Sequence, residues 1–161
     1  MYVLFSIAKI IMFPIVRLLF LVCGKGTQNI PKSGALIIAS NHVSAFDMFF
    51  IMTFFPRKIR FLAKAELFRT PLMNFFFRSA GAIPIDRSSV SAEPIKEALG
   101  ALGNGEVVGI FPQGTRCRGV DIRSTKPKNG VGMIAYHSKA SVLPVYISTK
   151  KMRARIFRRV Y

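Results

Sequence analysis

The stretch Asn41-His42-Val43-Ser44-Ala45-Phe46-Asp47 lies between two apolar runs, at 35–39 and 48–52, and decides how the chain folds around it. An apolar run, a polar segment and a second apolar run predict a buried strand, a loop and a helix. On one continuous helix, side chains five residues apart are separated by roughly 500° and lie on different faces. His42 and Asp47 can therefore meet only if His42 lies on the loop and Asp47 lies in the first turn of the helix.

His42 and Asp47 are a candidate general base and its orienting partner. An imidazole can take a proton near neutral pH, and a carboxylate can fix its tautomer and stabilise the imidazolium. Taken alone, a histidine near an aspartate is more often structural than catalytic. Ser44 lies between the two and would suggest a Ser-His-Asp nucleophile, but no Gly-x-Ser-x-Gly elbow surrounds it.

Apolar runs alternate with helical patterns along the rest of the chain, whose 161 residues are the length of one domain. We expect strands at 35–39, 59–63, 81–85, 107–111 and 142–147, and helices at 47–54, 71–79, 91–102 and 130–139. This alternation predicts an α/β fold with a mostly parallel central sheet flanked by helices. Ser91 is a possible cap for the helix at 91–102, and Pro94 fits its first turn.

The composition favours a partner that is both anionic and apolar. The chain has 24 Lys and Arg against 7 Asp and Glu, a net charge of +17, 15 Phe and a hydrophobic content of 51%. Such a charge attracts nucleic acid, anionic lipid surfaces or phosphorylated ligands. Because nucleic-acid binders seldom need so many Phe, we expect an anionic membrane surface and no nucleic acid. Cys23 and Cys117 form no disulfide framework and fit two thiols in a reducing cytosol.

Residues 2–22 are nearly all apolar and also point to a membrane. The run is interrupted by polar side chains and one helix breaker: Ser6, Lys9, Arg17 and Pro14. A broad apolar face with a thin basic stripe suits the bilayer interface, although the run is also just long enough to span, and a buried core helix is the alternative. We expect residues 1–23 to form a membrane-anchoring helix and residues 24–161 to form the main domain. No basic residue precedes the run, so a secretory signal is not expected.

Two later strands end in basic residues. Gly81-Ala82-Ile83-Pro84-Ile85 leads to Asp86-Arg87, and Gly109-Ile110-Phe111 leads to Pro112-Gln113-Gly114-Thr115-Arg116. In open α/β sheets, ligands bind at the carboxyl ends of the strands. Gly114 lets the backbone approach a ligand, and Arg116 can bind a phosphate through two parallel hydrogen bonds. Individually, a surface ion pair for Arg87 and an ordinary turn at Gln113-Gly114 are the commoner explanations.

These stretches form an ordered set with Val142-Leu143-Pro144-Val145. Asn-His-(four residues)-Asp, then Ile-Asp-Arg, then Phe-Pro-Gln-Gly-Thr-Arg, then Leu-Pro-Val resembles the four sequence blocks of the glycerolipid acyltransferases. It is most similar to the 1-acyl-sn-glycerol-3-phosphate (lysophosphatidic acid) acyltransferases, over about residues 1–150. The resemblance implies a membrane-associated O-acyltransferase of phospholipid biosynthesis, at the cytoplasmic face of the cell membrane. Its product would be phosphatidic acid, made from a thioester donor and the free hydroxyl of the lysolipid.

The resemblance also implies a role for individual residues. It makes His42 the general base and Asp47 its partner. The phosphate of the acceptor would be bound by Arg87, Gly114, Thr115, Arg116 and, as a weaker contact, Lys64. Pro144 belongs to the last block, whose role is structural. No metal or cofactor is implied, because acyl-CoA or acyl carrier protein enters as co-substrate, and His137 is expected on a helix surface.

The chain departs from the family pattern in two places. Gln113 stands where the third block usually begins with Glu, which leaves open any role that requires a carboxylate there. The chain also ends soon after the fourth block, and the stretch 156–161 looks like the start of a further strand, which suggests a truncated C-terminus. The open alternatives are the same chemistry on glycerol-3-phosphate or another lysolipid, and a non-catalytic basic protein that binds anionic membranes.

Overall fold

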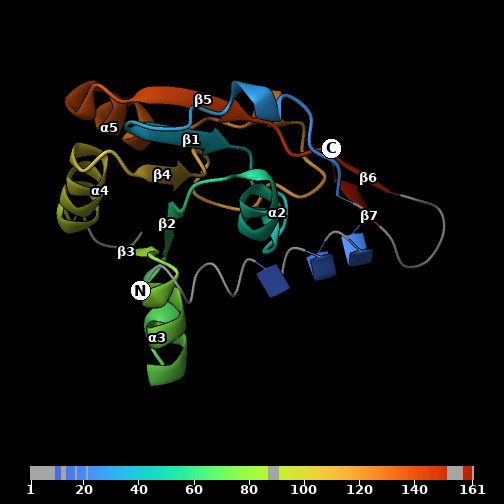
Figure 1. Cartoon of the computed structure of the whole chain (residues 1–161), viewed down its shortest axis with the longest axis horizontal. Helices are drawn as coiled ribbons and strands as arrows, with labels where there is room; N and C mark the ends of the chain where they lie inside the picture. Colours follow the sequence, from blue (N-terminus) through green and yellow to red (C-terminus); the bar gives the residue numbers. More distant parts are fainter. Residues whose placement is uncertain are drawn as a thin grey trace.

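Strands and helices alternate around one central sheet in the computed structural model (Figure 1). It describes residues 10–11, 14–16, 18–20, 22–86, 91–151 and 158–160. The elements of the main domain are β1 (Leu36–Ser40), α2 (Asp47–Phe54), β2 (Ile59–Lys64), the 3-10 turn η2 (Ala65–Phe68), α3 (Pro71–Ser79), β3 (Ile83–Ile85), α4 (Glu93–Gly103), β4 (Val107–Ile110), α5 (Gly130–Ser138) and β5 (Ser141–Val145). Every predicted strand and helix of the domain is therefore present.

The central sheet has five parallel strands in the order β3-β2-β4-β1-β5. β1 lies next to the middle of the sheet, and its Ile37 is in register with Val108 of β4 and Val142 of β5. A strand between two neighbours, with helices on both faces, is apolar on both sides. This explains why the run 35–39, just before Asn41, is apolar without interruption. The five parallel strands confirm the predicted parallel α/β fold.

The two faces of the sheet carry separate apolar clusters. Leu36 and Ile38 of β1 belong to the cluster that contains α2, whereas Ile37 belongs to the cluster that contains α4 and α5. Successive side chains of a strand point to opposite faces, so one strand supplies both clusters. The domain therefore has a helix layer on each side of the sheet, and α2 is held against it directly after the polar loop.

The borders of two strands differ from the expected ones. β3 starts at Ile83 rather than at 81, because Gly81 has a φ of 80° and closes the turn after α3. β5 ends at Val145 rather than at 147, because the backbone of Ile147 forms a hydrogen bond with the Asn41 side chain instead of continuing the strand. β5 is an edge strand, the usual location for a proline inside a sheet, and its Pro144 is exposed.

Hydroxyl side chains and prolines lie at the starts of α3 and α4. The Thr70 hydroxyl accepts a hydrogen bond from the Met73 amide at 3.3 Å, and Pro71 is the first residue of α3. At the start of α4 the N-cap position is taken by Ala92 rather than by the expected Ser91, whose hydroxyl accepts a hydrogen bond from the Glu93 amide at 3.3 Å from one residue further out. Pro94 lies in the first turn, as expected.

The two ends of the chain lie outside the central sheet. The described residues of 10–20 are helical, and Val16, Phe20 and Val22 pack on the α2 side of the core. No helix among the described residues is long and apolar enough to cross a membrane. The residues of the expected polar stripe, Ser6, Lys9 and Arg17, lie outside the described residues. Near the other end, β6 (Thr149–Lys151) and β7 (Arg158–Val160) form an antiparallel pair.

Candidate active site

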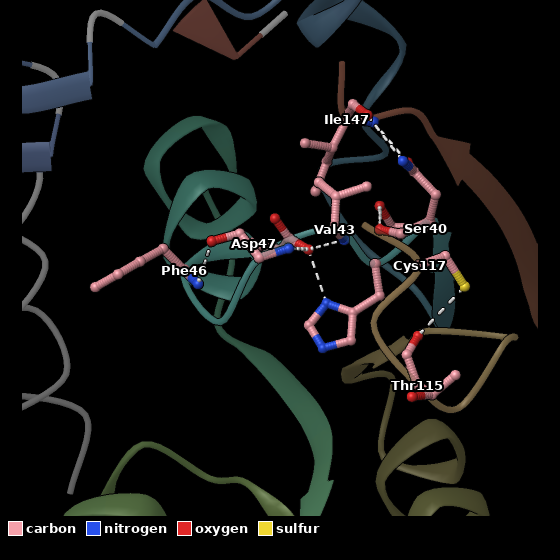
Figure 2. Close-up of polar contacts among 10 residues, drawn as sticks. Ser40, Val43, Phe46, Asp47, Thr115, Cys117 and Ile147 are labelled. Carbon is pink, nitrogen blue, oxygen red and sulfur yellow. Dashed lines mark hydrogen bonds and ion pairs between the residues drawn. The ribbon is translucent and has the colours of Figure 1, made fainter. Parts of the chain in front are cut away.

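His42 and Asp47 are brought together by the turn between β1 and α2. His42 Nδ1 lies 2.7 Å from Asp47 Oδ2, and the two residues are separated by five positions (Figure 2). His42 lies on the loop after β1, and Asp47 is the first residue of α2. This is the geometry that the sequence spacing requires if the pair is to act as a unit.

Asp47 is held in place by backbone donors from the same turn. Its Oδ2 accepts hydrogen bonds from the amides of Val43, at 2.6 Å, and Ser44, at 2.8 Å (Figure 2). The side chain is fully buried, and its Oδ1 has no hydrogen-bond partner among the described residues. The two short hydrogen bonds from backbone amides and the N-terminus of α2 stabilise a negative charge on Asp47. A buried carboxylate so held cannot rotate away from the imidazole.

The His42 ring is fixed from a second direction by an aromatic side chain. It stacks on Phe111 with ring centroids 4.1 Å apart, and Phe111 stacks in turn on Phe61 at 5.6 Å. With its proton on Nδ1 toward Asp47, the ring presents Nε2 as an acceptor. The His42 side chain retains 14% of its exposure. The imidazole is thus oriented, and it is still accessible to a substrate.

The flanking polar residues of the loop have structural partners. The Asn41 side chain donates to the Ile147 carbonyl at 2.8 Å and accepts from the Ile147 amide at 2.7 Å. These two hydrogen bonds join the end of β1 to the segment that follows β5. The Ser44 hydroxyl accepts a hydrogen bond from the Phe46 amide at 3.3 Å. Ser44 is therefore part of the turn, and none of its described hydrogen bonds reaches the His42 ring.

The loop after β4 is attached to His42 itself. The Cys117 amide donates to the His42 carbonyl at 2.8 Å, and the Gly114 amide donates to the Phe111 carbonyl at 2.9 Å. Gly114 has a φ of 67°, which favours glycine over any residue with a Cβ. His42 and this loop each follow a strand of the same parallel sheet, and the backbone contact joins them at its carboxyl edge.

Lys128 is a residue of this loop region that the sequence did not single out. Its amide donates to the Pro112 carbonyl at 2.8 Å. A Cβ built on Gly114 would lie 3.2 Å from Lys128 Cε and 3.5 Å from its Nζ, so the lysine side chain lies along the glycine. The only local signal is the basic run Lys126-Pro127-Lys128, which is easily taken for a solvated loop.

The other predicted phosphate-binding residues are less close together. Thr115 and Arg116 are exposed on the same loop as Gly114. Lys64 ends β2, with β4 between it and β1, and its ammonium lies 2.7 Å from Glu66. Arg87 lies outside the described residues, shortly after Ile85, which is in register with Lys64.

Gln113 is half-buried, and its side-chain oxygen has no hydrogen-bond partner among the described residues. A neutral amide tolerates that position better than a carboxylate would, because an unpaired buried charge is far more costly. Elsewhere, His137 is exposed on α5 beside Tyr136, as expected, and neither Cys23 nor Cys117 forms a disulfide.

An apolar cavity of about 290 Å³ lies beside α2. Its walls come from the C-terminal half of α2, from residues 22–30 and from residues 143–147. His42, Asp47 and Arg116 do not line it. The cavity has apolar walls from α2 and β5 together with polar residues of the segment 24–29, and it is separate from the polar groups around His42.

The chain is similar to known acyltransferases over most of its length. The sequence model of the acyltransferase family matches residues 22–148. The 1-acyl-sn-glycerol-3-phosphate acyltransferase of Borreliella burgdorferi is 37% identical over 122 residues, which are 74% of this chain and 48% of the relative. The enzyme of the same name from Bacillus subtilis is 32% identical over 118 residues, or 73% of this chain and 57% of the relative.

A solved structure agrees with these matches. The crystal structure of the 1-acyl-sn-glycerophosphate (LPA) acyltransferase PlsC from Thermotoga maritima superposes with a TM-score of 0.65 at 29% identity, and covers 87% of this chain and 59% of that one. The chain thus spans about half the length of the curated relatives described above. The family model, the sequence relatives and the shared structure agree with the four sequence blocks. The chain belongs to the acyltransferase family.

Proposed function

We propose that this chain transfers a fatty acyl group from a thioester donor to the free hydroxyl of 1-acyl-sn-glycerol-3-phosphate, which gives phosphatidic acid. The observation that carries the proposal is the 2.7 Å contact between His42 and the buried Asp47, beside a loop with exposed cations. The names of the relatives in the same family support the choice of acceptor.

The chemistry begins with the acceptor hydroxyl. An alcohol is a poor nucleophile at neutral pH, so a base has to take its proton as it attacks. His42 Nε2 accepts this proton, while Nδ1–H remains hydrogen-bonded to Asp47 Oδ2. The acceptor oxygen forms a bond to the thioester carbonyl carbon, and the carbonyl oxygen becomes an oxyanion that requires hydrogen-bond donors.

The second step breaks the carbon–sulfur bond. The tetrahedral intermediate collapses to the new ester, and the thiolate leaves. The imidazolium of His42 returns its proton to the sulfur, so the base is regenerated and no covalent acyl-enzyme is needed. The negative charge of Asp47 stabilises the imidazolium between these steps. Two contacts, with Asp47 and with Phe111, keep the ring in one orientation throughout.

The acceptor's phosphate would be held by the loop after β4. Arg116 provides two parallel donors, Gly114 allows a close approach of the backbone, and Thr115 adds a hydroxyl. The position of Lys128 along Gly114 supports adding this lysine to the set. Arg87 and Lys64, near the ends of β3 and β2, would contact the phosphate from the neighbouring strands. Binding of the phosphate places the hydroxyl beside His42 and removes the entropy of a two-body encounter.

The remaining partners follow from the substrates. Acyl-CoA or acyl carrier protein would bring the acyl group, and no cofactor is involved. Residues 1–23 would anchor the chain at the cytoplasmic face of the cell membrane. In support, exposed apolar side chains accompany the packed ones in this segment: Ile10, Ile11, Ile15, Leu18 and Leu19. An anionic membrane surface also suits the net charge of +17.

The direct test is acyl transfer by the purified full chain. Labelled acyl-CoA and acyl carrier protein donors are offered with a panel of acceptors: 1-acyl-sn-glycerol-3-phosphate, glycerol-3-phosphate, other lysophospholipids and monoacylglycerol. We expect the highest kcat/KM with 1-acyl-sn-glycerol-3-phosphate and little transfer to monoacylglycerol, which lacks the phosphate. A higher value with another acceptor would reassign the substrate, and absence of transfer to every acceptor would contradict the activity.

A further inference from the structure

α3 exposes an apolar face that the packing of the domain does not use. The helix has no buried residue, and its large apolar side chains are open to solvent: Leu72, Met73, Phe75 and Phe76. Phe75 is 63% exposed and Leu72 is 71% exposed. Leu72, Phe75 and Phe76 are spaced by three and four residues, so they share one face of the helix. A continuous apolar patch of this kind marks an interaction surface.

Ring and cation contacts that attach α3 to η2 come from its last turn. Phe77 packs against Phe68 of η2 with ring centroids 5.4 Å apart, and the Arg78 guanidinium lies 5.7 Å from the Phe68 ring. Figure 1 shows α3 extending away from the sheet beyond the end of β2. The exposed face is therefore available to a partner without any change in the core.

The segment that carries the patch starts from the edge of the sheet where the candidate active site is located. η2 and α3 follow β2, so they begin at the carboxyl edge of a parallel sheet. The loop with His42 and the loop with Arg116 also begin at this edge. A partner that binds α3 would thus approach the domain from the end of the sheet that carries these two loops.

Basic side chains border the patch. Lys64 and Arg69 are exposed in and around η2, together with the acidic Glu66. Arg78, near the end of α3, is also exposed, but its guanidinium lies 3.8 Å from the Glu97 carboxylate. The hydrogen bond from Lys64 holds the pKa of Glu66 below its ordinary value, so this carboxylate stays charged and occupies Lys64. Arg69 directly precedes the helix and is the exposed guanidinium beside the patch, whereas Arg78 lies on the helix face opposite Phe76 and faces Glu97 and Phe68. An exposed apolar face with a guanidinium at its start, on a chain with a net charge of +17, matches an anionic lipid surface.

We propose that η2 and α3 form a second membrane-docking surface, separate from residues 1–23. Leu72, Phe75 and Phe76 enter the boundary between headgroups and acyl chains, and Arg69 contacts anionic headgroups. This inference goes beyond the proposed activity, because it concerns where the bilayer lies against the domain. It orients the carboxyl edge of the sheet toward the membrane.

The test uses fluorescence, because the natural chain contains no Trp. Phe75→Trp in the full chain places one probe in the patch, and Tyr136→Trp, at an exposed position of α5, is the matched control. Vesicles of phosphatidylcholine mixed with phosphatidylglycerol are added to each protein. We expect a blue shift and quenching by bromine-labelled acyl chains for Phe75→Trp, and neither change for Tyr136→Trp. Water-exposed emission of Phe75→Trp in vesicle-bound protein would overturn the proposal.

A second variant measures how much the patch contributes. Phe75→Ser with Phe76→Ser is expected to lower partitioning to the mixed vesicles about tenfold. Met133→Ser with Tyr136→Ser, which removes exposed apolar side chains from α5, is expected to leave it unchanged. Transfer to a detergent-solubilised acceptor should be equal in both, so that loss of docking is distinguished from loss of chemistry. Unchanged partitioning of the α3 variant, alone or with a change in its oligomeric state, would overturn the membrane assignment.

Discussion

The segment that follows β1 keeps its ionisable pair inside the protein, whereas the segment that follows β4 leaves its cations at the surface. Asp47 is fully buried and accepts two amide hydrogen bonds, and His42 is held between Asp47 and Phe111. Arg116 and Lys128 are exposed, on a loop whose main contacts are backbone hydrogen bonds. Both segments lie at the carboxyl edge of the same sheet.

The difference corresponds to the two tasks that we propose for the site. A general base has to be oriented before the substrate arrives, because its contribution depends on geometry. An anion-binding side chain has to exchange water for phosphate, and long exposed cations do this at little cost in desolvation. We therefore expect substitutions after β1 to change kcat and stability, and substitutions after β4 to change the acceptor KM.

His42→Ala is expected to have the largest effect. Removal of the base should lower kcat by about 10³-fold, within the usual range for general acid–base catalysis. His137→Ala is the matched control, since His137 is exposed on α5, and it should retain full activity. Binding of the His42 variant to liposomes should be intact. Acyl transfer that survives in the purified variant would show that another group takes the proton.

Asp47→Asn tests whether the buried charge matters as well as the shape. The neutral amide cannot stabilise the imidazolium as a carboxylate does, so kcat should fall about 10²-fold. Its oxygen can still accept from the two backbone amides, but its NH₂ group then occupies the buried position of Oδ1, which has no partner among the described residues, so stability should fall by about 1–3 kcal/mol. Urea unfolding and steady-state kinetics measure the two effects. Asp121→Asn is the control in the other segment, because Asp121 is exposed and accepts from the Arg123 amide at 3.0 Å. Equal stability losses in the two variants would contradict the contrast between buried and exposed carboxylates.

The sequence predicted most of the fold because its signals are local. Apolar runs between turn residues fixed the strands, and the meeting of His42 and Asp47 follows from the turn that their spacing requires. The end of β5 was predicted two residues too far, since an apolar run does not reveal that Ile147 leaves the sheet to bind Asn41. That contact joins residues 106 positions apart, and no local pattern encodes it.

The same limit applies to the site. Gly114 was selected for its backbone freedom, but the side chain that uses the space beside it, Lys128, comes from the loop before α5. The stacking of His42 on Phe111 depends on the adjacency of β1 and β4, which the order of the elements does not determine. The exposed face of α3 was also missed, because an apolar helical segment is normally expected to face a core.

Arg116→Ala addresses the exposed side of the comparison. Loss of two charge-assisted hydrogen bonds to the phosphate should raise the acceptor KM about tenfold, while the donor KM and the stability change little. Arg118→Ala, another exposed arginine of the loop, is the control for loss of charge alone. Equal changes in the KM of acceptor and donor would argue against a phosphate contact by Arg116.

Lys128→Ala is expected to have the smallest effect and to be the most specific test of the loop after β4. Lys128 is a point charge beside Gly114, so its loss should raise the acceptor KM about threefold, and added salt should reduce the difference. Lys126→Ala removes the same charge from an exposed position two residues away and should leave the KM unchanged. An equal increase in both variants would mean that the general basic field attracts the acceptor. An increase confined to Lys128→Ala would instead assign the lysine to the phosphate site, because only its side chain lies along the glycine.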